Sequence, residues 1–408
     1  MSFVLLALIL DVPRYTLSIF LVIWFSLSRI DEGRPPSQFR VTAIIPCYNG
    51  GNGLERTARS LSALRNEGLI EIIAVNDGST DDTSRIIERL KSEGVIDAAI
   101  THRRRQGKSA AINHAARFAR GDLIFNVDAD TIIIEAGSIL QLQSIFFNEK
   151  TAGVSGNLFV NNSGENLLTS LQSLEYTLSF LAGRTMLVNF DAVACLSGAF
   201  SMYRKSIFVT LGGMDTGPGE DLEIGMQMRR LGYALGFVPS AVAQTNAPTT
   251  FLGLVRQRMR WERDSYWIRM IQYQEWKILR HGDTIGDAFS HIDFVLFEFL
   301  STLLFPFYLI YTIYCYGGYA LYLFWVAYVF MLSVFIINMA TALAFLPHRL
   351  NLFDAFAVIV MPIYQGIILK IVRFIAYSSE ILGEASKYDD FVPGYVRDAL
   401  YRKRKDTP

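Results

Sequence analysis

The chain has 408 residues, of which 51% are hydrophobic, 13% aromatic and only 19% charged. This is too apolar for an ordinary soluble domain, in which about a quarter of the residues are charged, so we expect part of the chain to lie in lipid. The 38 basic and 38 acidic side chains cancel, and this balance argues against nucleic-acid binding. Cys47, Cys195 and Cys315 are widely spaced, which supports neither a disulfide framework nor a zinc site and favours a reducing compartment.

Hydrophobic residues dominate the N-terminal segment 1–28, apart from Asp11 and Arg14. Because this segment has neither a basic leader nor a small-residue cleavage site, we expect residues 1–30 to be a retained transmembrane anchor rather than a signal peptide. Residues 35–285 have ordinary polarity, and this length suffices for one large α/β domain with its own core. We expect the chemistry of the protein to lie there.

Three short runs rich in β-branched residues predict strands that end in polar residues: VTAIIPCYNG (41–50), EIIAVNDGS (71–79) and LIFNVDADT (123–131). Helical patterns separate them, at 53–68 and 81–94. Alternating strands and helices predict a mostly parallel sheet with right-handed crossovers. Ligands of such sheets bind at the carboxyl ends of the strands. The polar residues expected at that edge are Tyr48, Asn49, Asp77, Asp128 and Asp130.

Three of these patterns have both a functional and a purely structural interpretation. Asp128 and Asp130 can hold a divalent cation that binds a diphosphate, since Mg²⁺ needs few protein ligands, or they can form a solvated strand end. Asp77 can accept hydrogen bonds from a nucleoside, or it can be an Asp-Gly turn residue. Lys108 near a predicted helix start can contact a diphosphate, or it can lie on the surface of an amphipathic helix. His102 stands where a Walker loop needs glycine, which argues against an ATPase.

Two clusters further along the chain also have both a functional and a structural interpretation. Glu220 and Asp221 follow a loop rich in glycine and proline and precede a helical pattern, so they are helix-cap residues or a general base. Gln257, Arg260 and Trp261 have the spacing i, i+3 and i+4 and therefore share one face of a helix. Such a face suits contact with a diphosphate and stacking on a sugar ring, or it anchors a helix at the membrane interface.

Hydrophobic character returns at 291–378, in the stretches 294–314, 319–346 and 353–377. The first two are long enough to span a bilayer. The third contains Pro362, Lys370 and Arg373, so it either spans the membrane or lies in the interface. Basic residues follow the N-terminal anchor and recur in the tail as YRKRK (401–405), which predicts that both the middle domain and the tail are cytoplasmic. This favours an interfacial third segment.

Taken together, seven segments resemble the family 2 glycosyltransferases, specifically the membrane-embedded synthases of cellulose, chitin, hyaluronan and poly-N-acetylglucosamine. They are PCYNG (46–50), VNDGS (75–79), QGKSAAINHA (106–115), DADT (128–131), CLSGAFSMYRK (195–205), GED (219–221) and QRMRW (257–261). The resemblance implies an α/β domain of the GT-A type (Rossmann-like, mostly parallel sheet) at 35–285. It also implies amphipathic interface helices near 166–187 and 250–275, transmembrane or interfacial helices at 291–378, and a cytoplasmic tail at 379–408.

The resemblance also implies a role for each site residue. Nucleotide-sugar binding is implied for Pro46, Tyr48, Asn49, Asp77, Lys108, Asp128, Gln257, Arg260 and Trp261. Asp130, together with Asp128, would bind Mg²⁺ or Mn²⁺. Asp221 would be the base of the Glu220-Asp221 pair, which the family usually precedes with threonine where this chain has Gly219. Ser197, Gly198 and Trp261 would lie near the acceptor.

The activity so implied is inverting transfer of a sugar from a UDP-sugar, with glucose or N-acetylglucosamine expected, to the end of a growing polysaccharide. The enzyme would be a multi-pass protein of the plasma or inner membrane that couples synthesis to translocation, as a homo-oligomer or with an export subunit. One alternative is single transfer to a membrane lipid, as in ceramide glucosyltransferases. Another is an inactive membrane scaffold, which the intact aspartates and Arg260 disfavour. The sequence does not identify the sugar, the linkage or the acceptor.

Overall fold

The structure is a computed structural model that describes residues 19, 20, 23, 39–215, 217, 219–275, 277, 284–345, 351–388, 393–396 and 398. Almost all of the expected anchor at 1–30, and the basic residues 401–405, lie outside these residues. The chain divides into two compact units, each described by itself. The sheet unit comprises 32–161, 193–246 and 385–408, and the helical unit comprises 1–31, 162–192 and 247–384.

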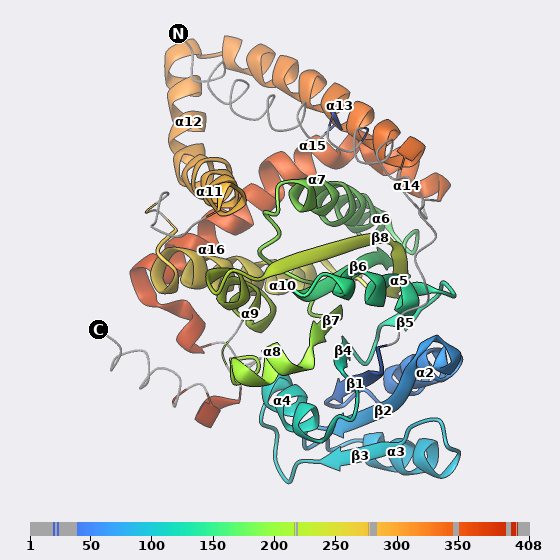
Figure 1. Ribbon diagram of the computed structural model, residues 1–408. Helices are drawn as coiled ribbons and strands as arrows, with labels where there is room; N and C mark the ends of the chain where they lie inside the picture. Colours follow the sequence, from blue (N-terminus) through green and yellow to red (C-terminus); the bar gives the residue numbers. More distant parts are fainter. Residues whose placement is uncertain are drawn as a thin grey trace. The chain divides into compact units, whose positions relative to one another are not determined.

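An eight-stranded sheet forms the centre of the sheet unit (Figure 1), in the order β3-β2-β1-β4-β7-β6-β8-β5. Its strands are β1 (Val41–Cys47), β2 (Leu69–Asn76), β3 (Ala98–Thr101), β4 (Leu123–Val127), β5 (Ile132–Ile133), β6 (Thr151–Val160), β7 (Phe200–Arg204) and β8 (Ala234–Thr245). Strands β3, β2, β1 and β4 are all parallel, as their separation by helices predicted. Strand β7 runs antiparallel to both β4 and β6. The sheet is therefore mostly parallel, and the expected α/β fold class is confirmed.

Short helices connect and cover these strands. They are α2 (Gly51–Ser62), α3 (Thr83–Ser92), α4 (Lys108–Phe118), α5 (Ser138–Ser144), α8 (Lys205–Thr210) and α9 (Glu220–Arg230), with single 3₁₀ turns at Arg65–Glu67, Ile145–Phe147 and Ala385–Tyr388. In helix α2, Leu54, Ala58 and Leu61 recur at helical spacing and are fully buried, so one apolar face packs into the core and stabilises the helix. Strand β1 is buried along its whole length, as expected for a strand covered on both faces.

The helical unit contains two helical stretches at the positions where amphipathic helices were expected. The first runs through α6 (Leu167–Glu175), a π-helical segment (Tyr176–Ala182) and α7 (Gly183–Asn189), and the second through α10 (Phe251–Tyr266) and a π-helical segment (Trp267–Gln272). Leu171 and Leu174 of α6 pack with Phe335, Met339 and Tyr364 from the hydrophobic C-terminal helices. The apolar face of α6 therefore contacts other helices of its own unit.

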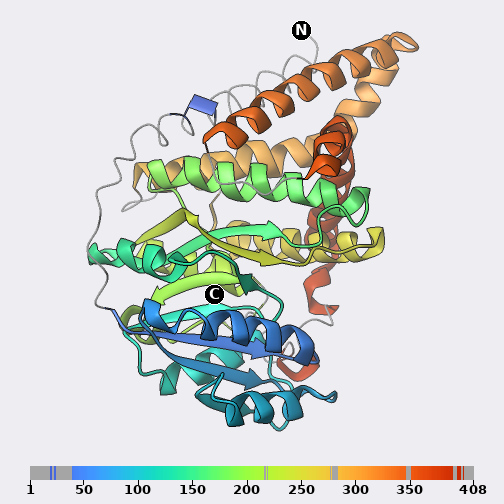
Figure 2. The same cartoon turned by 90° about the vertical axis from the view of Figure 1, so that its right-hand side faces the viewer.

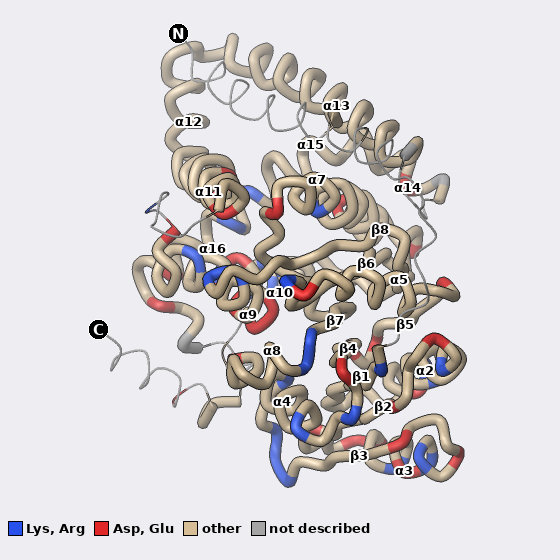
Figure 3. Tube along the Cα trace, in the orientation of Figure 1, with Lys and Arg blue, Asp and Glu red and all other residues tan. Residues whose placement is uncertain are grey.

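Three helices of the described chain are long and apolar enough to cross a membrane: Ile285–Tyr316, Tyr319–Ala344 and Phe353–Gly383. The first comprises α11 (Ile285–Ile292), a π-helical segment (Asp293–Leu300) and α12 (Ser301–Tyr316), and the second is α13 (Tyr319–Phe345). The third comprises α14 (Leu352–Ala357), a 3₁₀ turn (Val358–Val360), α15 (Met361–Ile363), a π-helical segment (Tyr364–Leu369) and α16 (Lys370–Gly383). Helices α12 and α13 carry no charged side chain (Figure 3), and α13 is one long continuous helix, drawn in orange in Figure 2. By length the third helix also permits a crossing, so its interfacial position stays a prediction.

Helix α9 packs closely against the chain segment that precedes β7. A Cβ atom added to Gly225 would lie only 2.1 Å from the carbonyl oxygen of Ala194. Because α9 begins with Glu220 and Asp221, this contact sets where those two carboxylates lie in the sheet unit. Only glycine permits so close an approach of the two backbones.

We therefore expect Gly225→Ala to push α9 away from residue 194 and to destabilise the protein by about 1–3 kcal/mol, the usual effect of overpacking. Thermal unfolding of the detergent-purified chain measures this as a lower Tm. The control is Gly366→Ala on the third hydrophobic helix, where an added Cβ atom meets nothing within 4 Å. Equal Tm values for the two variants would show that the α9 contact imposes no such constraint.

Candidate active site

The ends of β1 and β2 are joined by hydrogen bonds between the turns that follow them. The backbone N–H of Asn49 donates to Ser79 Oγ (3.0 Å), and the Thr80 N–H donates to Asn49 Oδ1 (2.8 Å). Asn49 has a left-handed backbone, with φ = 51°, which asparagine tolerates better than most residues. The N–H of Asp77 donates to the Cys47 carbonyl oxygen (2.8 Å). These contacts bring Tyr48, Asn49 and Asp77 to one edge of the sheet, as predicted.

Asp77 is almost completely buried, at 3% exposure, and both of its carboxylate oxygens accept hydrogen bonds from the protein. Oδ1 accepts from the Gln106 N–H and contacts His102 Nδ1, both at 2.8 Å, and Oδ2 accepts from the Gly107 N–H at 2.7 Å. Asp77 therefore holds the loop formed by residues 102–107, the 102–107 loop, against the sheet. This loop leads directly into α4, whose first residue is Lys108.

A pair of stacked histidines extends the contacts of Asp77. His102 Nε2 lies 2.9 Å from His114 Nδ1, and the two rings are stacked with their centroids 5.2 Å apart. Burial, and then the charges of His102 and Arg117, lower the pKa of His114, so its imidazole is neutral at neutral pH. From the sequence, His102 served only as evidence against a Walker loop, and His114 was not predicted to contribute.

Tyr48 presents a partly exposed aromatic ring beside the 102–107 loop. The Arg105 guanidinium lies 4.5 Å from the centre of this ring, within the range of a cation–π contact. The 102–107 loop passes so close to the turn after β2 that a Cβ atom on Gly78 would lie 2.5 Å from the backbone nitrogen of Arg105. With φ = 72° as well, this position requires glycine.

Lys108 joins the ends of three elements through charge contacts. Its Nζ lies 2.6 Å from Asp128 Oδ1 at the end of β4 and 3.6 Å from Glu220 Oε1 at the start of α9. Burial by itself lowers the pKa of Lys108, but the charges of Asp128 and then Glu220 outweigh burial, so the net shift is upward. Lys108 is therefore a permanent cation among carboxylates, rather than a surface lysine on an amphipathic helix.

Gly198 is the point at which these groups meet. Its carbonyl oxygen accepts from Lys108 Nζ (2.9 Å) and Asn126 Nδ2 (2.7 Å), and its N–H donates to Asp221 Oδ2 (3.1 Å). A Cβ atom here would lie 3.0 Å from Asp221 Oδ2 and 3.3 Å from Lys108 Nζ. Any larger residue at 198 would therefore have to displace the lysine and the aspartate. We call Lys108, Asp128, Gly198, Glu220 and Asp221 the Gly198 cluster.

The charge of this edge favours a cation. Lys108 is outnumbered by four carboxylates, those of Asp128, Asp130, Glu220 and Asp221. Burial raises the pKa of Asp130, and the negative charge of Asp128 raises it further. No group of three or more His, Cys, Asp or Glu side chains that could hold a metal ion occurs in the described part of the chain. Two carboxylates with further oxygens from a diphosphate and water nevertheless match the hard, oxygen-rich ligand set of Mg²⁺ or Mn²⁺. The residues therefore fit such an ion once a diphosphate is bound.

The remaining predicted site residues divide between the two units. Pro46 is buried within β1, and Ser197 is 9% exposed directly before Gly198. Gln257, Arg260 and Trp261 all lie on α10 of the helical unit. Asn126 and Arg105 were not predicted as site residues. A signal for Asn126 existed, because it is the one polar residue in the strand LIFNV and lies two residues before Asp128.

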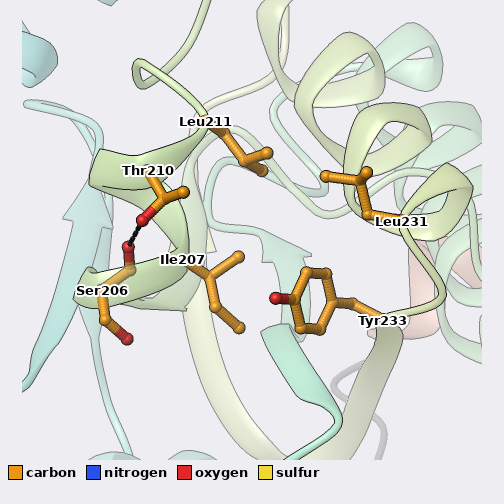
Figure 4. Close-up of a pocket in the computed structure, with 6 residues that line it drawn as sticks. All are labelled: Ser206, Ile207, Thr210, Leu211, Leu231 and Tyr233. Atoms are coloured by element: carbon orange, nitrogen blue, oxygen red, sulfur yellow. Dashed lines mark hydrogen bonds between the residues drawn. The ribbon is translucent and has the colours of Figure 1, made fainter.

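An apolar hollow elsewhere in the sheet unit is separate from these residues. It has a volume of about 240 Å³ and lies between α8 and the turn from α9 to β8 (Figure 4). Its lining residues are Ser206, Ile207, Thr210, Leu211, Leu231 and Tyr233. Since this lining includes neither a charged side chain nor a predicted site residue, we assign the candidate site to the polar edge of the sheet.

The chain resembles known glycosyltransferases in sequence. It is 33% identical over 240 residues, 56% of this chain and 60% of that protein, to an N-acetylglucosaminyltransferase from Azorhizobium caulinodans. It is 29% identical over 222 residues, 54% of this chain and 53% of that protein, to a poly-beta-1,6-N-acetyl-D-glucosamine synthase from Staphylococcus aureus. The chain thus spans little more than half the length of these curated relatives.

A solved structure supports the fold. A mannosyltransferase from Pyrobaculum calidifontis, solved in complex with GDP-Man and Mn²⁺, superimposes with a TM-score of 0.56 at 17% identity, covering 93% of this chain and 99% of that one. The chain therefore has a GT-A-like fold, as the motifs implied. Residues 42–212 match the model of the family described as glycosyl transferase family 2. This chain therefore carries a glycosyl transferase family 2 domain, as its motifs predicted.

Proposed function

We propose that this protein is an inverting glycosyltransferase that moves a sugar from a UDP-sugar to a hydroxyl group at the end of a growing polysaccharide. The observation that carries this proposal is the Gly198 cluster. It brings a half-buried cation, Lys108, and two carboxylates, Asp128 and Asp221, together around one backbone position at the carboxyl end of the sheet. A diphosphate site and a general base would therefore lie next to each other.

The donor would bind along the edge between β1 and β4. The Tyr48 ring and Asn49 would line the nucleoside site, and the 102–107 loop held by Asp77 would border it. Lys108 at the start of α4 would contact the diphosphate, since helix N-termini attract phosphate. Asp130 and Asp128 would hold Mg²⁺ or Mn²⁺. When bound, the ion would offset the negative charge that develops on the departing diphosphate.

Asp221 would act as the base. The Gly198 N–H holds its Oδ2, while the Leu222 N–H donates to Oδ1 at 2.8 Å, so the carboxylate is oriented by backbone groups. The acceptor oxygen would attack the anomeric carbon as Asp221 takes its proton, and the bond from that carbon to the diphosphate would break. A single displacement of this kind inverts the anomeric configuration. Glu220 would support the reaction by forming an ion pair with Lys108 and so holding that side chain in place.

On α10 of the helical unit, Gln257, Arg260 and Trp261 would contact the nucleotide-sugar or the acceptor. An amide and a guanidinium suit the diphosphate, and an indole suits a sugar ring of the acceptor. Three helices able to cross a membrane fit a multi-pass protein of the plasma or inner membrane with a cytoplasmic catalytic domain. Coupled translocation would need a polar path between helices, supplied by a homo-oligomer or an export subunit, because a saccharide cannot cross hydrocarbon unaided.

N-acetylglucosamine is the sugar we propose, because the relatives from Azorhizobium caulinodans and Staphylococcus aureus are named for its transfer and for its polymer. Membranes containing the chain should convert radiolabelled UDP-N-acetylglucosamine into a ladder of saccharides on a sizing gel. UDP-glucose and GDP-mannose, given separately, should yield no ladder. A single labelled glycolipid would contradict polymerisation and favour transfer to a membrane lipid, and no labelled product from any donor would contradict the activity.

We expect Asp221→Asn to lower kcat by at least about a hundredfold, since it removes the base and retains the shape of the side chain. Binding of UDP, measured by calorimetry, should change little because Asp221 faces the acceptor in this proposal. Glu88→Gln, an exposed carboxylate on α3, is the matched control and should keep normal turnover. Unchanged kcat in the Asp221→Asn variant would remove Asp221 from the mechanism.

Metal removal tests the roles of Asp128 and Asp130. EDTA should abolish transfer and excess Mn²⁺ should restore it, because four carboxylates otherwise repel the diphosphate. Asp130→Asn should raise the Mn²⁺ concentration for half-maximal activity about tenfold or more, whereas Asp82→Asn, at an exposed position on the same unit, should not change it. Full activity in EDTA would contradict a metal-dependent site.

A further inference from the structure

The helical unit buries an arginine that lies inside the QRMRW segment but outside the residues that define the signature. Arg258 on α10 is only 3% exposed. Its exposed neighbour Arg256 lies two residues earlier on the same helix. Buried guanidinium groups are uncommon and costly unless they are paired. The contacts of Arg258 therefore need a structural or functional explanation.

Arg258 contacts two signature residues directly. Its Nη1 donates to Gln257 Oε1 at 2.8 Å, which turns the NH₂ group of that amide away from the guanidinium and leaves it oriented as a donor. Its guanidinium carbon lies 4.2 Å from the centre of the Trp261 ring, a cation–π distance. Phe180 lies 6.4 Å from the same ring, centre to centre. The indole thus lies beside both a cation and a second aromatic ring.

The opposite side of the guanidinium is fixed by a carboxylate. Arg258 Nη2 donates to Glu175 Oε2 at 2.8 Å, and the hydroxyl of Tyr364 donates to the same oxygen at 2.7 Å. Glu175 ends α6, and Tyr364 lies on the third hydrophobic helix. Burial by itself lowers the pKa of Arg258, but the charge of Glu175 outweighs burial and raises it. The arginine therefore stays charged and paired.

The surroundings of this ion pair are apolar. Tyr364 packs in one hydrophobic cluster with Leu171, Leu174, Leu254 and Met361. In such an environment the pair must keep its geometry, because breaking it would leave a buried charge without compensation. The three elements that supply Glu175, Arg258 and Tyr364 are thereby locked together at this point.

We infer that Arg258 is a positioning residue, which orients Gln257 and Trp261 for substrate through its pairing with Glu175 and Tyr364. It connects the signature side chains to α6 and to the third hydrophobic helix. Movement of that helix would therefore change the orientation of Trp261. The inference rests on the proposed function in one respect: Gln257 and Trp261 must contact the donor or the acceptor.

The experiment compares Arg258→Met, Arg258→Lys and the matched control Arg256→Met in the full chain in detergent. The first measurement is kcat and KM with UDP-N-acetylglucosamine and an N-acetylglucosamine oligomer as acceptor. We expect Arg258→Met to lower kcat/KM for the acceptor about tenfold to a hundredfold, as misplacement of substrate contacts does. Arg258→Lys, which keeps a charge beside Glu175, should recover part of this loss. Arg256→Met and UDP binding should stay unchanged.

A second measurement is independent of turnover. The emission of Trp261 is isolated by subtracting the spectrum of a Trp261→Phe variant, in the native background and in each arginine variant. Loss of the stacked cation should shift this difference spectrum in Arg258→Met and leave it unchanged in Arg256→Met. In the double variant Arg258→Met/Trp261→Phe, the loss of activity should be no larger than that of the more damaging single change, because both act through one ring.

Each result decides the inference. If Arg258→Met matches Arg256→Met in kinetics and in the difference spectrum, or if the double variant loses the product of the single losses, Arg258 is not a positioning residue. If the native chain transfers no sugar while the spectrum still shifts, the proposed function fails and the placement of Trp261 by Arg258 stands. If Arg258→Met does not fold, Glu175→Gln and Tyr364→Phe, which preserve side-chain shape, take its place with the same measurements and the same expected directions.

Discussion

The contacts of the Gly198 backbone are the constraint on which the candidate site depends. Because residue 198 has no side chain, Lys108, Asn126 and Asp221 can all reach its peptide groups. These three side chains come from different elements of the sheet unit, so one residue joins β4, α4 and α9. The close approach of α9 to residue 194 at Gly225 maintains the same arrangement from the other side. Two glycines thus determine where Lys108 and Asp221 lie.

Charge explains why this arrangement suits an anionic substrate only together with a cation. Lys108 is surrounded by carboxylates, and two of them, Asp128 and Asp130, lie one residue apart at the end of β4. Bringing a diphosphate to such a surface is unfavourable unless positive charge accompanies it. The same carboxylates that repel the free diphosphate would attract its complex with Mg²⁺ or Mn²⁺. Metal dependence in the proposed function follows from this imbalance.

The parallel half of the sheet could be predicted from the sequence, whereas the other half could not. Strands β1, β2 and β4 are continuous β-branched runs that end in polar residues, so their position and the edge they share could be predicted. Strand β3 is only AAIT and has no clear pattern. Antiparallel β7 depends on pairing with β4 and β6, which are distant in the chain, and local pattern does not encode such pairing.

The same distinction applies to the site. Asp77, Asp128 and Asp221 were predicted because motifs mark them, and Lys108 was predicted as one of two alternatives. What Asp77 does locally was not predictable, since its partners are backbone N–H groups of the 102–107 loop. Arg258 was passed over because its burial depends on Glu175, which lies 83 residues earlier in the chain. Partners so distant in sequence are known only once the chain is folded.

The most direct test of the account is an experimental structure of the chain with UDP-N-acetylglucosamine and Mn²⁺, using anomalous scattering to locate the metal. We predict Mn²⁺ against Asp128 and Asp130, the uracil against Tyr48, and the diphosphate within reach of Lys108. A nucleotide bound away from the carboxyl ends of β1 and β4, or Mn²⁺ on other residues, would contradict it.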